Sequence, residues 1–187
     1  MFEEIDYEQE ADNAERFASL FVDNPAVYVP RVERMLSSTR VLTTTWIEGS
    51  KMRDSKELIE QRLDPAALIR TGVICGLQQL LEFGYFHADP HPGNLFALQG
   101  RSGDMGHVGY VDFGMMDTIS DSDRLTLTGA VVHLINRDFA GLAEDFQNLG
   151  FLSPTADLTS IIPALEEVLG GSLGETVGSV SYTHLRA

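Results

Sequence analysis

The chain has 187 residues, 43% of them hydrophobic, which is enough for one globular domain with a hydrophobic core or most of a larger domain. Its formal net charge of −15, from 28 acidic and 13 basic residues, repels phosphate backbones and argues against direct nucleic-acid binding. A single cysteine excludes an intrachain disulfide, and no apolar run is long enough to cross a bilayer. The acidic start MFEEIDYEQE lacks the pattern of a secretory signal peptide, so we expect none.

The first predicted element is an amphipathic helix over residues 6–22. Small and aromatic residues recur at spacings of three and four, which gives the helix one apolar face. This face consists of Ala14, Phe17, Ala18 and Phe21. Acidic residues crowd the first turns, where the helix dipole favours negative charge, and the Asn24-Pro25 pair ends the helix.

Two strands and a linker are predicted next. Residues 27–32 and 40–47 are rich in β-branched and aromatic side chains, so we expect antiparallel strands joined around Ser37-Ser38. The charged residues 50–63 are expected to form a linker with a short helix.

A second long helix is predicted to begin at Asp64-Pro65 and to end at Gly84. Asp64 is a suitable capping side chain, and proline is favoured at the first helical position. The predicted apolar stripe of this helix is Ile69, Val73, Gly76, Leu77, Leu80 and Leu81. The glycines Gly72 and Gly76 indicate close packing against another backbone.

The remainder of the chain is predicted to contain a hairpin followed by three helices. The hairpin pairs residues 94–98 with residues 108–112. The helices are expected at residues 120–136, 139–149 and 156–169. Pro163 weakens the third of them, and the segment GGSLGETVGSVSYTHLRA has no periodicity from which to predict an element.

The segment YFHADPHPGNLF crowds histidine, aspartate and asparagine onto a loop stiffened by proline and glycine. Asp89 and Asn94 are separated by four residues, and Asp112 follows in VDFG at the end of an apolar strand. This order is the spacing of kinase-like phosphotransferases. Such enzymes need Mg²⁺ to neutralise phosphate oxygens, and Mg²⁺ prefers the oxygen ligands that carboxylate and amide groups supply.

The spacing predicts a role for each of these residues. Asp89 is the predicted catalytic base, which orients the attacking hydroxyl or water and accepts its proton. Asn94 and Asp112 are predicted to bind the metal ion and, through it, the nucleotide. His87 is expected to be a buried anchor for the loop.

The same residues allow other interpretations. Asp-Phe-Gly alone can be an ordinary turn. The spacing of His87, Asp89 and His91 could serve a zinc or iron site on a strand, although the prolines of the loop argue against a strand. His133 lies on a predicted apolar helix and is expected to be a core or boundary residue.

The combination of motifs resembles the UbiB family of atypical kinases, also called AarF-domain or activity-of-bc1-complex kinases. The resemblance is carried by YFHADPHPGNLF, YVDFGMM, EEIDYEQEADNAERF and VLTTTWIEGSKMRD. It implies an α+β, protein-kinase-like fold, mostly the helical C-lobe with an acidic helix and two strands from the N-lobe side. We expect residues 1–178 to form this partial domain and leave residues 179–187 unassigned.

The resemblance further implies ATP and Mg²⁺ as cofactors. Glu10 matches the helix glutamate that pairs with a phosphate-binding lysine in kinases, and Glu4 and Asp6 match acidic positions near the nucleotide. From the residues alone, a solvated acidic helix start is the favoured interpretation of all three. The family's glycine- or alanine-rich nucleotide loop, lysine-bearing strand and Lys-x-Gly-Gln motif are not recognisable in the chain, so we expect little activity from it alone.

The family association is with isoprenoid quinone (ubiquinone) biosynthesis at a membrane. The resemblance therefore implies an ATP-dependent kinase or ATPase, cytoplasmic or peripheral at the inner membrane. A lipid or quinone precursor is the implied substrate, and membrane contact is expected through regions outside the chain. The alternatives are a non-catalytic nucleotide-binding or protein-interaction module and a small-molecule kinase of the aminoglycoside or choline type.

Overall fold

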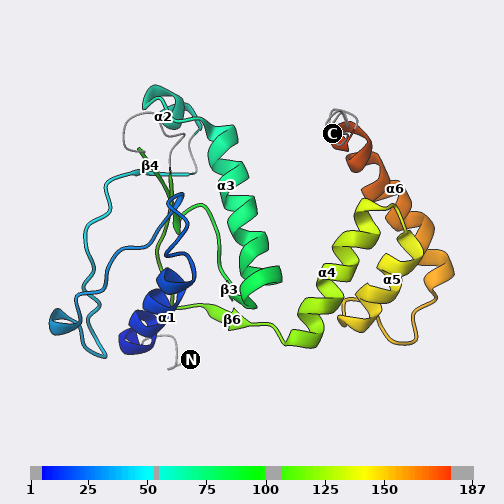
Figure 1. The fold of residues 1–187 in the computed structure, drawn as a ribbon, viewed down its shortest axis with the longest axis horizontal. Coiled ribbons are helices and arrows are strands. Elements are labelled where there is room, and N and C mark those ends of the chain that lie inside the picture. Colours follow the sequence, from blue (N-terminus) through cyan, green and yellow to red (C-terminus); the bar gives the residue numbers. More distant parts are fainter. Residues whose placement is uncertain (1–5, 53–54, 100–106, 178–187) are drawn as a thin grey trace, which may run out of the picture. The chain divides into compact units, whose positions relative to one another are not determined.

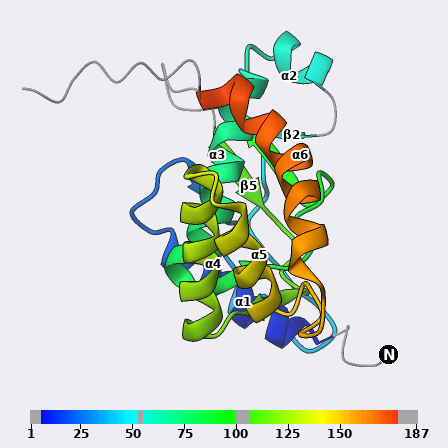
Figure 2. The same cartoon turned by 90° about the vertical axis from the view of Figure 1, so that its right-hand side faces the viewer.

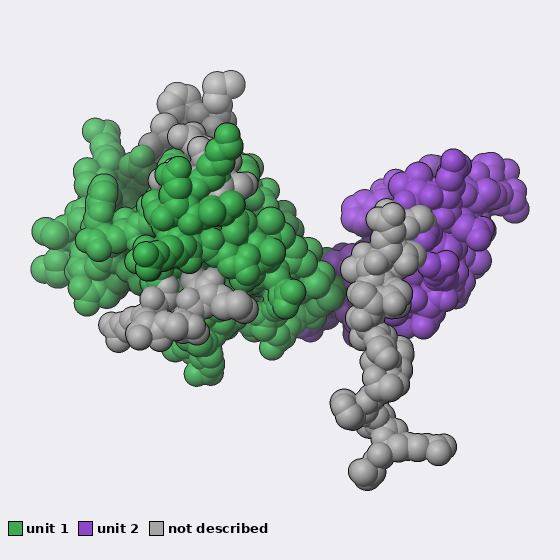
Figure 3. All heavy atoms as spheres, turned by 90° about the horizontal axis from the view of Figure 1, so that it is seen from above, with its two compact units in different colours: residues 1–119 green, residues 120–187 purple. Residues whose placement is uncertain are grey.

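The computed structural model describes residues 6–52, 55–99 and 107–177, and the chain divides into two compact units (Figures 1 and 3). The first unit, residues 1–119, combines helices with β-strands, whereas the described part of the second unit, residues 120–187, is helical. The predicted α+β class is therefore confirmed.

Helix α1, Tyr7–Leu20, opens the first unit, close to the predicted bounds. The Asp6 side chain caps it by accepting a hydrogen bond from the Glu8 amide at 3.0 Å. Its predicted apolar face is confirmed, because Ala14, Phe17 and Phe21 are buried. The ring of Phe17 has its centroid 4.9 Å from that of Phe21, 5.1 Å from that of Tyr110 and 5.2 Å from that of Phe113. This aromatic cluster joins α1 to the Asp-Phe-Gly segment.

A four-stranded sheet has the order β1-β5-β4-β2. Its strands are β1 (Val27–Tyr28), β2 (Ser50–Lys51), β4 (Leu95–Leu98) and β5 (His107–Tyr110). β4 and β5 are antiparallel, with Leu95 opposite Tyr110, which confirms the predicted hairpin. A separate two-stranded ladder pairs β3 (Tyr85–His87) with β6 (Met116–Thr118), as Figure 1 shows. The candidate loop therefore leaves β3 and enters β4.

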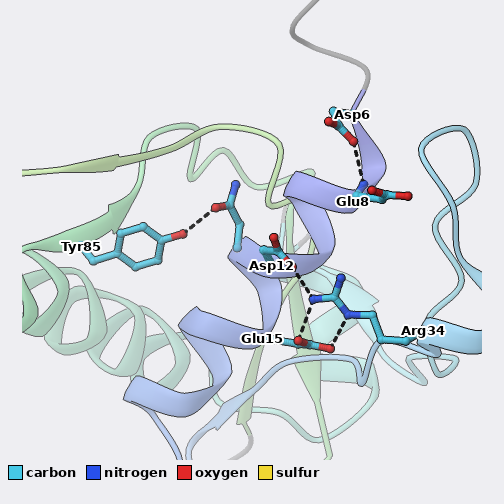
Figure 4. Close-up of polar contacts among 7 residues, drawn as sticks. Asp6, Glu8, Asp12, Glu15, Arg34 and Tyr85 are labelled. Atoms are coloured by element: carbon cyan, nitrogen blue, oxygen red, sulfur yellow. Dashed lines mark hydrogen bonds and ion pairs between the residues drawn. The ribbon is translucent and has the colours of Figure 1, made fainter.

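The two strands predicted at residues 27–32 and 40–47 are only partly present. β1 pairs in parallel with β5. It stops at Tyr28, because Pro30 has no amide hydrogen with which to continue the ladder. The predicted antiparallel pairing survives as isolated bridges, Val32 with Thr44 and Ser38 with Val41. This ribbon contains the short turn η2, Arg34–Leu36, and is tied to α1 by ion pairs of Arg34 with Asp12 and Glu15 (Figure 4).

A short helix α2, Ser55–Glu60, leads to α3, Pro65–Leu77, which continues as the π-helical segment η3, Gln78–Phe83. Both predicted ends are confirmed: Asp64 caps the first turn, and Gly84 ends the helix with a left-handed φ of 63°. The predicted stripe is only partly confirmed, however, since Ile69, Val73 and Leu77 are 60%, 56% and 46% exposed, whereas Leu80 and Leu81 are half-buried. Instead Ala67, Leu68, Cys75 and Gln79 are buried.

The error on α3 has a physical cause. Its sequence PAALIRTGVICGL is apolar around most of its circumference, so the pattern does not select one face. Close packing at Gly72 and Gly76 is also not seen, because no described atom beyond the adjacent residues and the nearby backbone of the same helix lies within 4 Å of a Cβ placed on either glycine.

The second unit contains α4 (Asp121–Ile135), α5 (Phe139–Asn148) and α6 (Leu158–Val177), which lie side by side in Figures 1 and 2. Their core is formed by Ala130, Phe139 and Leu142. His133 is a boundary residue, as predicted, and its Nδ1 lies 2.8 Å from a carboxylate oxygen of Asp145.

Helix α6 extends beyond the predicted residues 156–169 into the glycine-rich segment. Glycine costs about 1 kcal/mol relative to alanine in a helix, which lowers helix propensity without forbidding the helix. Pro163 is accommodated inside it. Within the described residues, no helix combines the length and the apolar character needed to cross a membrane.

Candidate active site

The loop between β3 and β4 is closed by its own hydrogen bonds. The Asn94 amide donates to the His91 carbonyl at 2.9 Å, and the Gly93 amide donates to His91 Nδ1 at 2.9 Å. The Asn94 side chain donates from Nδ2 to the Asp89 carbonyl at 3.2 Å. Asp89 and Asn94 are therefore held together at the two ends of one turn.

His87 anchors this loop from the interior, as predicted. It is 3% exposed, and its Nδ1 accepts a hydrogen bond from the Asp89 amide at 3.2 Å. Its Nε2 lies 3.3 Å from the Val111 carbonyl, one residue before Asp112. The buried Gln79 of η3 accepts the His87 amide at 2.9 Å. His87 thus links the Asp89 loop to the strand end that carries Asp112.

The bonds of His87 do not favour the alternative zinc or iron site, although His91 Nε2 lies 3.6 Å from a carboxylate oxygen of Asp89. Both of its ring nitrogens are engaged by backbone groups, and the Nδ1 of His91 accepts the Gly93 amide. No group of three or more His, Cys, Asp or Glu side chains able to hold a metal occurs in the part of the chain that the structure describes.

Asn94 and Asp112 lie at adjacent ends of β4 and β5. The Val111 amide donates to the Asn94 carbonyl at 3.0 Å, so Asp112 follows directly after the residue that opposes Asn94. Asp112 has a φ of 63°, a left-handed conformation that is uncommon for a residue other than glycine. Such strained residues cluster at functional sites.

The side chains of Asn94 and Asp112 suit a magnesium ion. Asn94 is 6% exposed, and its Nδ2 donates a hydrogen bond to the Asp89 carbonyl. Among the described residues, none donates a hydrogen bond to its Oδ1. Asp112 is exposed, and its backbone follows directly after Val111, which bonds the Asn94 carbonyl. One oriented amide oxygen and one carboxylate are ligands of the kind that Mg²⁺ accepts, with waters and phosphate oxygens completing its shell.

Helix α1 contributes Glu10 to the site. Glu10 Oε1 accepts the amide of Phe113 at 3.2 Å. Burial raises the pKa of the Glu10 carboxyl, and the negative charge of Asp112 raises it further, whereas the bond from Phe113 acts in the opposite direction. A Cβ placed on Gly114 would lie 3.4 Å from an Asp112 oxygen and 3.9 Å from a Glu10 oxygen, so both carboxylates approach the same point.

The other two predicted acidic positions are Glu4 and Asp6. Glu4 lies outside the described residues. Asp6 is exposed and serves as the cap of α1, where its carboxylate bonds the Glu8 amide (Figure 4). The pairing of Glu10 with a lysine stays a prediction.

A cavity of about 370 Å³ opens between α1 and the Asp-Phe-Gly segment. Its lining residues are Tyr7, Glu10, Ala14, Pro30, Leu42, Thr44, Val111, Asp112 and Phe113. Its volume is within the range of small-molecule sites. Asp89 and Asn94 are not part of this lining, so the cavity meets the candidate metal site at Asp112.

Sequence reasoning missed Asn13, Gln79 and Tyr85. Asn13 donates to the Phe113 carbonyl at 2.9 Å and accepts from the Tyr85 hydroxyl at 3.0 Å. Asn13 follows Glu10 by one helical turn, so the two side chains lie on the same helix face. This spacing could have indicated that Asn13 also belongs to the site. The position of Gln79 depends on the π-helical turn of η3, which the sequence does not indicate.

Comparison with known proteins decides the family. The profile of the ABC1 atypical kinase-like domain matches residues 1–146. The chain belongs to this family. It is 48% identical to the uncharacterized protein slr1919 of Synechocystis sp. over 97% of the chain and 31% of that protein. It is 42% identical to the chloroplastic activity of bc1 complex kinase 3 of Arabidopsis thaliana over 99% of the chain and 25% of that protein.

More distant relatives carry the same family names. The probable protein kinase UbiB of Shewanella halifaxensis is 28% identical over 97% of the chain and 33% of that protein. Among solved structures, Rv3197 of Mycobacterium tuberculosis in complex with erythromycin has a TM-score of 0.59 at 23% identity, covering 99% of this chain and 48% of that one. With the family match, this likeness confirms the predicted protein-kinase-like fold.

The chain spans about a quarter to a third of the length of the first curated relatives that it matches. The activity of the ABC1 family is kinase-like.

Proposed function

We propose that this chain supplies the catalytic residues of an ATP- and Mg²⁺-dependent kinase or ATPase of the UbiB type. The observation that carries the proposal is the hydrogen bond from the Val111 amide to the Asn94 carbonyl at 3.0 Å. It brings the strand end that bears Asp112 beside the loop that bears Asp89 and Asn94. The match to the ABC1 family supports the same assignment.

In this proposal each side chain has one task. Asn94 Oδ1 and the Asp112 carboxylate hold the metal ion, and bound Mg²⁺ supplies neutralisation of the phosphate oxygens. Asp89 orients the hydroxyl or water that attacks and takes its proton. His87 maintains the relative position of the Asp89 loop and Val111 through its two ring nitrogens.

The test of the metal role is Asp112→Asn. We expect Mg²⁺-dependent binding of ATP to weaken about 10-fold or more, because even outer-shell changes alter metal affinity by that much. The measurement is calorimetric titration of ATP into the purified chain at several Mg²⁺ concentrations. Equal affinities for the wild type and the variant, at every Mg²⁺ concentration, would remove Asp112 from the metal site.

Asp89→Asn is the matched variant for the role of base. It should retain binding of Mg²⁺ and ATP but lower the rate of ATP hydrolysis by about 100-fold, a typical contribution of a general base, when both are measured in a longer protein that joins this chain to the family's nucleotide loop and lysine-bearing strand. Loss of binding in this variant would count against its assignment as the base.

We propose in addition that the substrate is a lipid or a quinone precursor in isoprenoid quinone (ubiquinone) biosynthesis, met at a membrane surface. The support is the family resemblance and the similarity to a probable protein kinase UbiB. A further arm of the hydrolysis assay adds vesicles with and without a prenylated phenol. Stimulation only by the prenylated phenol is expected, and identical rates in both would contradict a quinone precursor as the substrate.

A further inference from the structure

The backbone of Phe113 is held on both sides by one helix. Its amide donates to Glu10 at 3.2 Å, and its carbonyl accepts from Asn13 at 2.9 Å. Glu10 and Asn13 lie one turn apart on α1, so they face the same segment. Helix α1 therefore holds one polar group of each peptide that flanks Phe113: Glu10 holds the peptide that follows Asp112, and Asn13 holds the peptide that follows Phe113.

Asn13 makes a second contact, to the strand that leads into the Asp89 loop. Its Oδ1 accepts the Tyr85 hydroxyl at 3.0 Å, a bond drawn in Figure 4. Tyr85 is 3% exposed and is the first residue of β3. The guanidinium of Arg16, one turn further along α1, lies 3.9 Å from the centroid of the Tyr85 ring. Tyr85 is thus fixed both by its ring and by its hydroxyl.

An amide is the side chain that fits this position. Asn13 uses its donor toward Phe113 and its acceptor toward Tyr85, and a carboxylate could not donate to the Phe113 carbonyl. A leucine of similar size would satisfy neither partner. The arrangement therefore depends on the chemistry of Asn13 and not only on its volume.

Fixing Phe113 restrains the backbone from which the Asp112 side chain projects. Asp112 has a left-handed φ of 63°, which persists only where neighbouring groups hold it. The buried Phe113 ring packs on Phe17 with centroids 5.2 Å apart, and the bonds to α1 restrain its backbone. Freeing the Phe113 carbonyl would let the peptide after Phe113 rotate. Among the described residues, it would leave the bond from the Phe113 amide to Glu10 as the only polar tie between α1 and the backbone of Phe113.

We propose that Asn13 is a positioning residue that couples α1 to the Asp112 segment and to β3 at the same time. The proposal deepens the proposed function, because it assigns to α1 the orientation of the metal-binding carboxylate. A displacement of α1 along its axis would then alter Asp112 and the start of the Asp89 strand together. No contact of Asn13 with the nucleotide is implied.

The first test measures the coupling without any activity. Hydrogen exchange of the Phe113 amide is followed by NMR in the wild type, Asn13→Leu, Tyr85→Phe and the control Gln9→Leu. Gln9 is an exposed amide side chain on the same helix. We expect protection of the Phe113 amide to fall about 10-fold in Asn13→Leu, about 3-fold in Tyr85→Phe and not at all in Gln9→Leu.

The second test measures the consequence for the metal site. The Mg²⁺ concentration that gives half-maximal ATP binding should rise about 5-fold to 10-fold in Asn13→Leu and less in Tyr85→Phe, while ATP binding without Mg²⁺ stays as in the wild type. A residue with a merely structural role would lower the melting temperature without shifting this Mg²⁺ dependence.

The outcomes separate this proposal from the proposed function. Unchanged protection of the Phe113 amide in Asn13→Leu would overturn the coupling even if the wild type binds Mg²⁺ and ATP. Reduced protection without any Mg²⁺-dependent ATP binding in the wild type would confirm the link to α1 and remove the metal role of Asp112. If Asn13→Leu does not fold, Tyr85→Phe replaces it, because that variant deletes one oxygen and keeps the buried ring. Protection of the Phe113 amide and the Mg²⁺ dependence of ATP binding in Tyr85→Phe then test the proposal.

Discussion

At the scale of single residues, the site brings the carboxylates of Glu10 and Asp112 close together. Glu10 and Asp112 approach the same point beside Gly114, and burial together with the charge of Asp112 raises the pKa of Glu10. A bound divalent cation would relieve this repulsion. Without a cation, ionised Glu10 destabilises the folded chain, because a carboxylate with a raised pKa favours its protonated form in the fold.

Replacement of Glu10 by glutamine tests this electrostatic cost. The Gln oxygen still accepts the Phe113 amide, but it carries no charge. We expect Glu10→Gln to raise the free energy of unfolding at neutral pH by about 0.5 kcal/mol, a small value because the side chain is partly solvated. The measurement is urea unfolding of both proteins at several pH values in the absence of Mg²⁺.

The sign of the pH dependence follows from the raised pKa. At pH values below the ordinary pKa of a carboxyl group, Glu10 is protonated in both the folded and the unfolded state. The wild type and the variant should then have equal free energies of unfolding. The relative stability of the wild type should decline as the pH rises from the ordinary carboxyl pKa through the raised pKa of the folded state. A wild type that becomes relatively more stable over this interval would contradict the proposed cost.

At the scale of elements, α1 was predictable because it has one buried and one exposed face, and the β4–β5 hairpin because two short apolar runs are separated by a glycine-rich segment. Ala14, Phe17 and Phe21 repeat at helical spacing, and all three are buried. α3 was not predictable in this way, since its apolar residues surround the helix. Its true core positions are set by packing on β5, which a local pattern cannot show.

Neighbouring residues of α3 provide a matched pair of variants. Leu68 is fully buried, whereas Ile69 is 60% exposed. We expect Leu68→Ala to lower the free energy of unfolding by about 2–5 kcal/mol through lost burial and cavity formation. Ile69→Ala should change it by about 0.5 kcal/mol or less, as for exposed positions.

Chemical unfolding of the two variants compares the observed burial with the predicted stripe. A larger loss for Ile69→Ala than for Leu68→Ala would mean that the stripe predicted from the sequence, and not the observed one, is buried.

At the scale of the whole molecule, the chain forms two units, each with its own hydrophobic core. The sequence motifs identified the family and the order of the site segments. The loop was recognisable because Asp89 and Asn94 are close together in the sequence. The predicted boundary at residue 178 stays a prediction. The wider site was not predictable, since Asn13 bonds residues that lie 72 and 100 positions away along the chain.

Family membership and site geometry lead to the same central claim at this scale. Asn94 and Asp112, on segments separated in sequence, are proposed to serve one metal ion at the end of an ATP triphosphate. The hydrogen bond between the Val111 amide and the Asn94 carbonyl is the structural basis for that claim. The roles of Asp89, Glu10 and Asn13 all depend on it.

The most direct measurement is a crystal structure of the protein with Mg²⁺ and a non-hydrolysable ATP analogue. We predict a single Mg²⁺ ion with Asn94 Oδ1 and an Asp112 carboxylate oxygen both at about 2.1 Å, beside the phosphate oxygens. An ion bound by only one of these side chains, or the two side chains directed toward separate ions in separate cavities, would contradict the account.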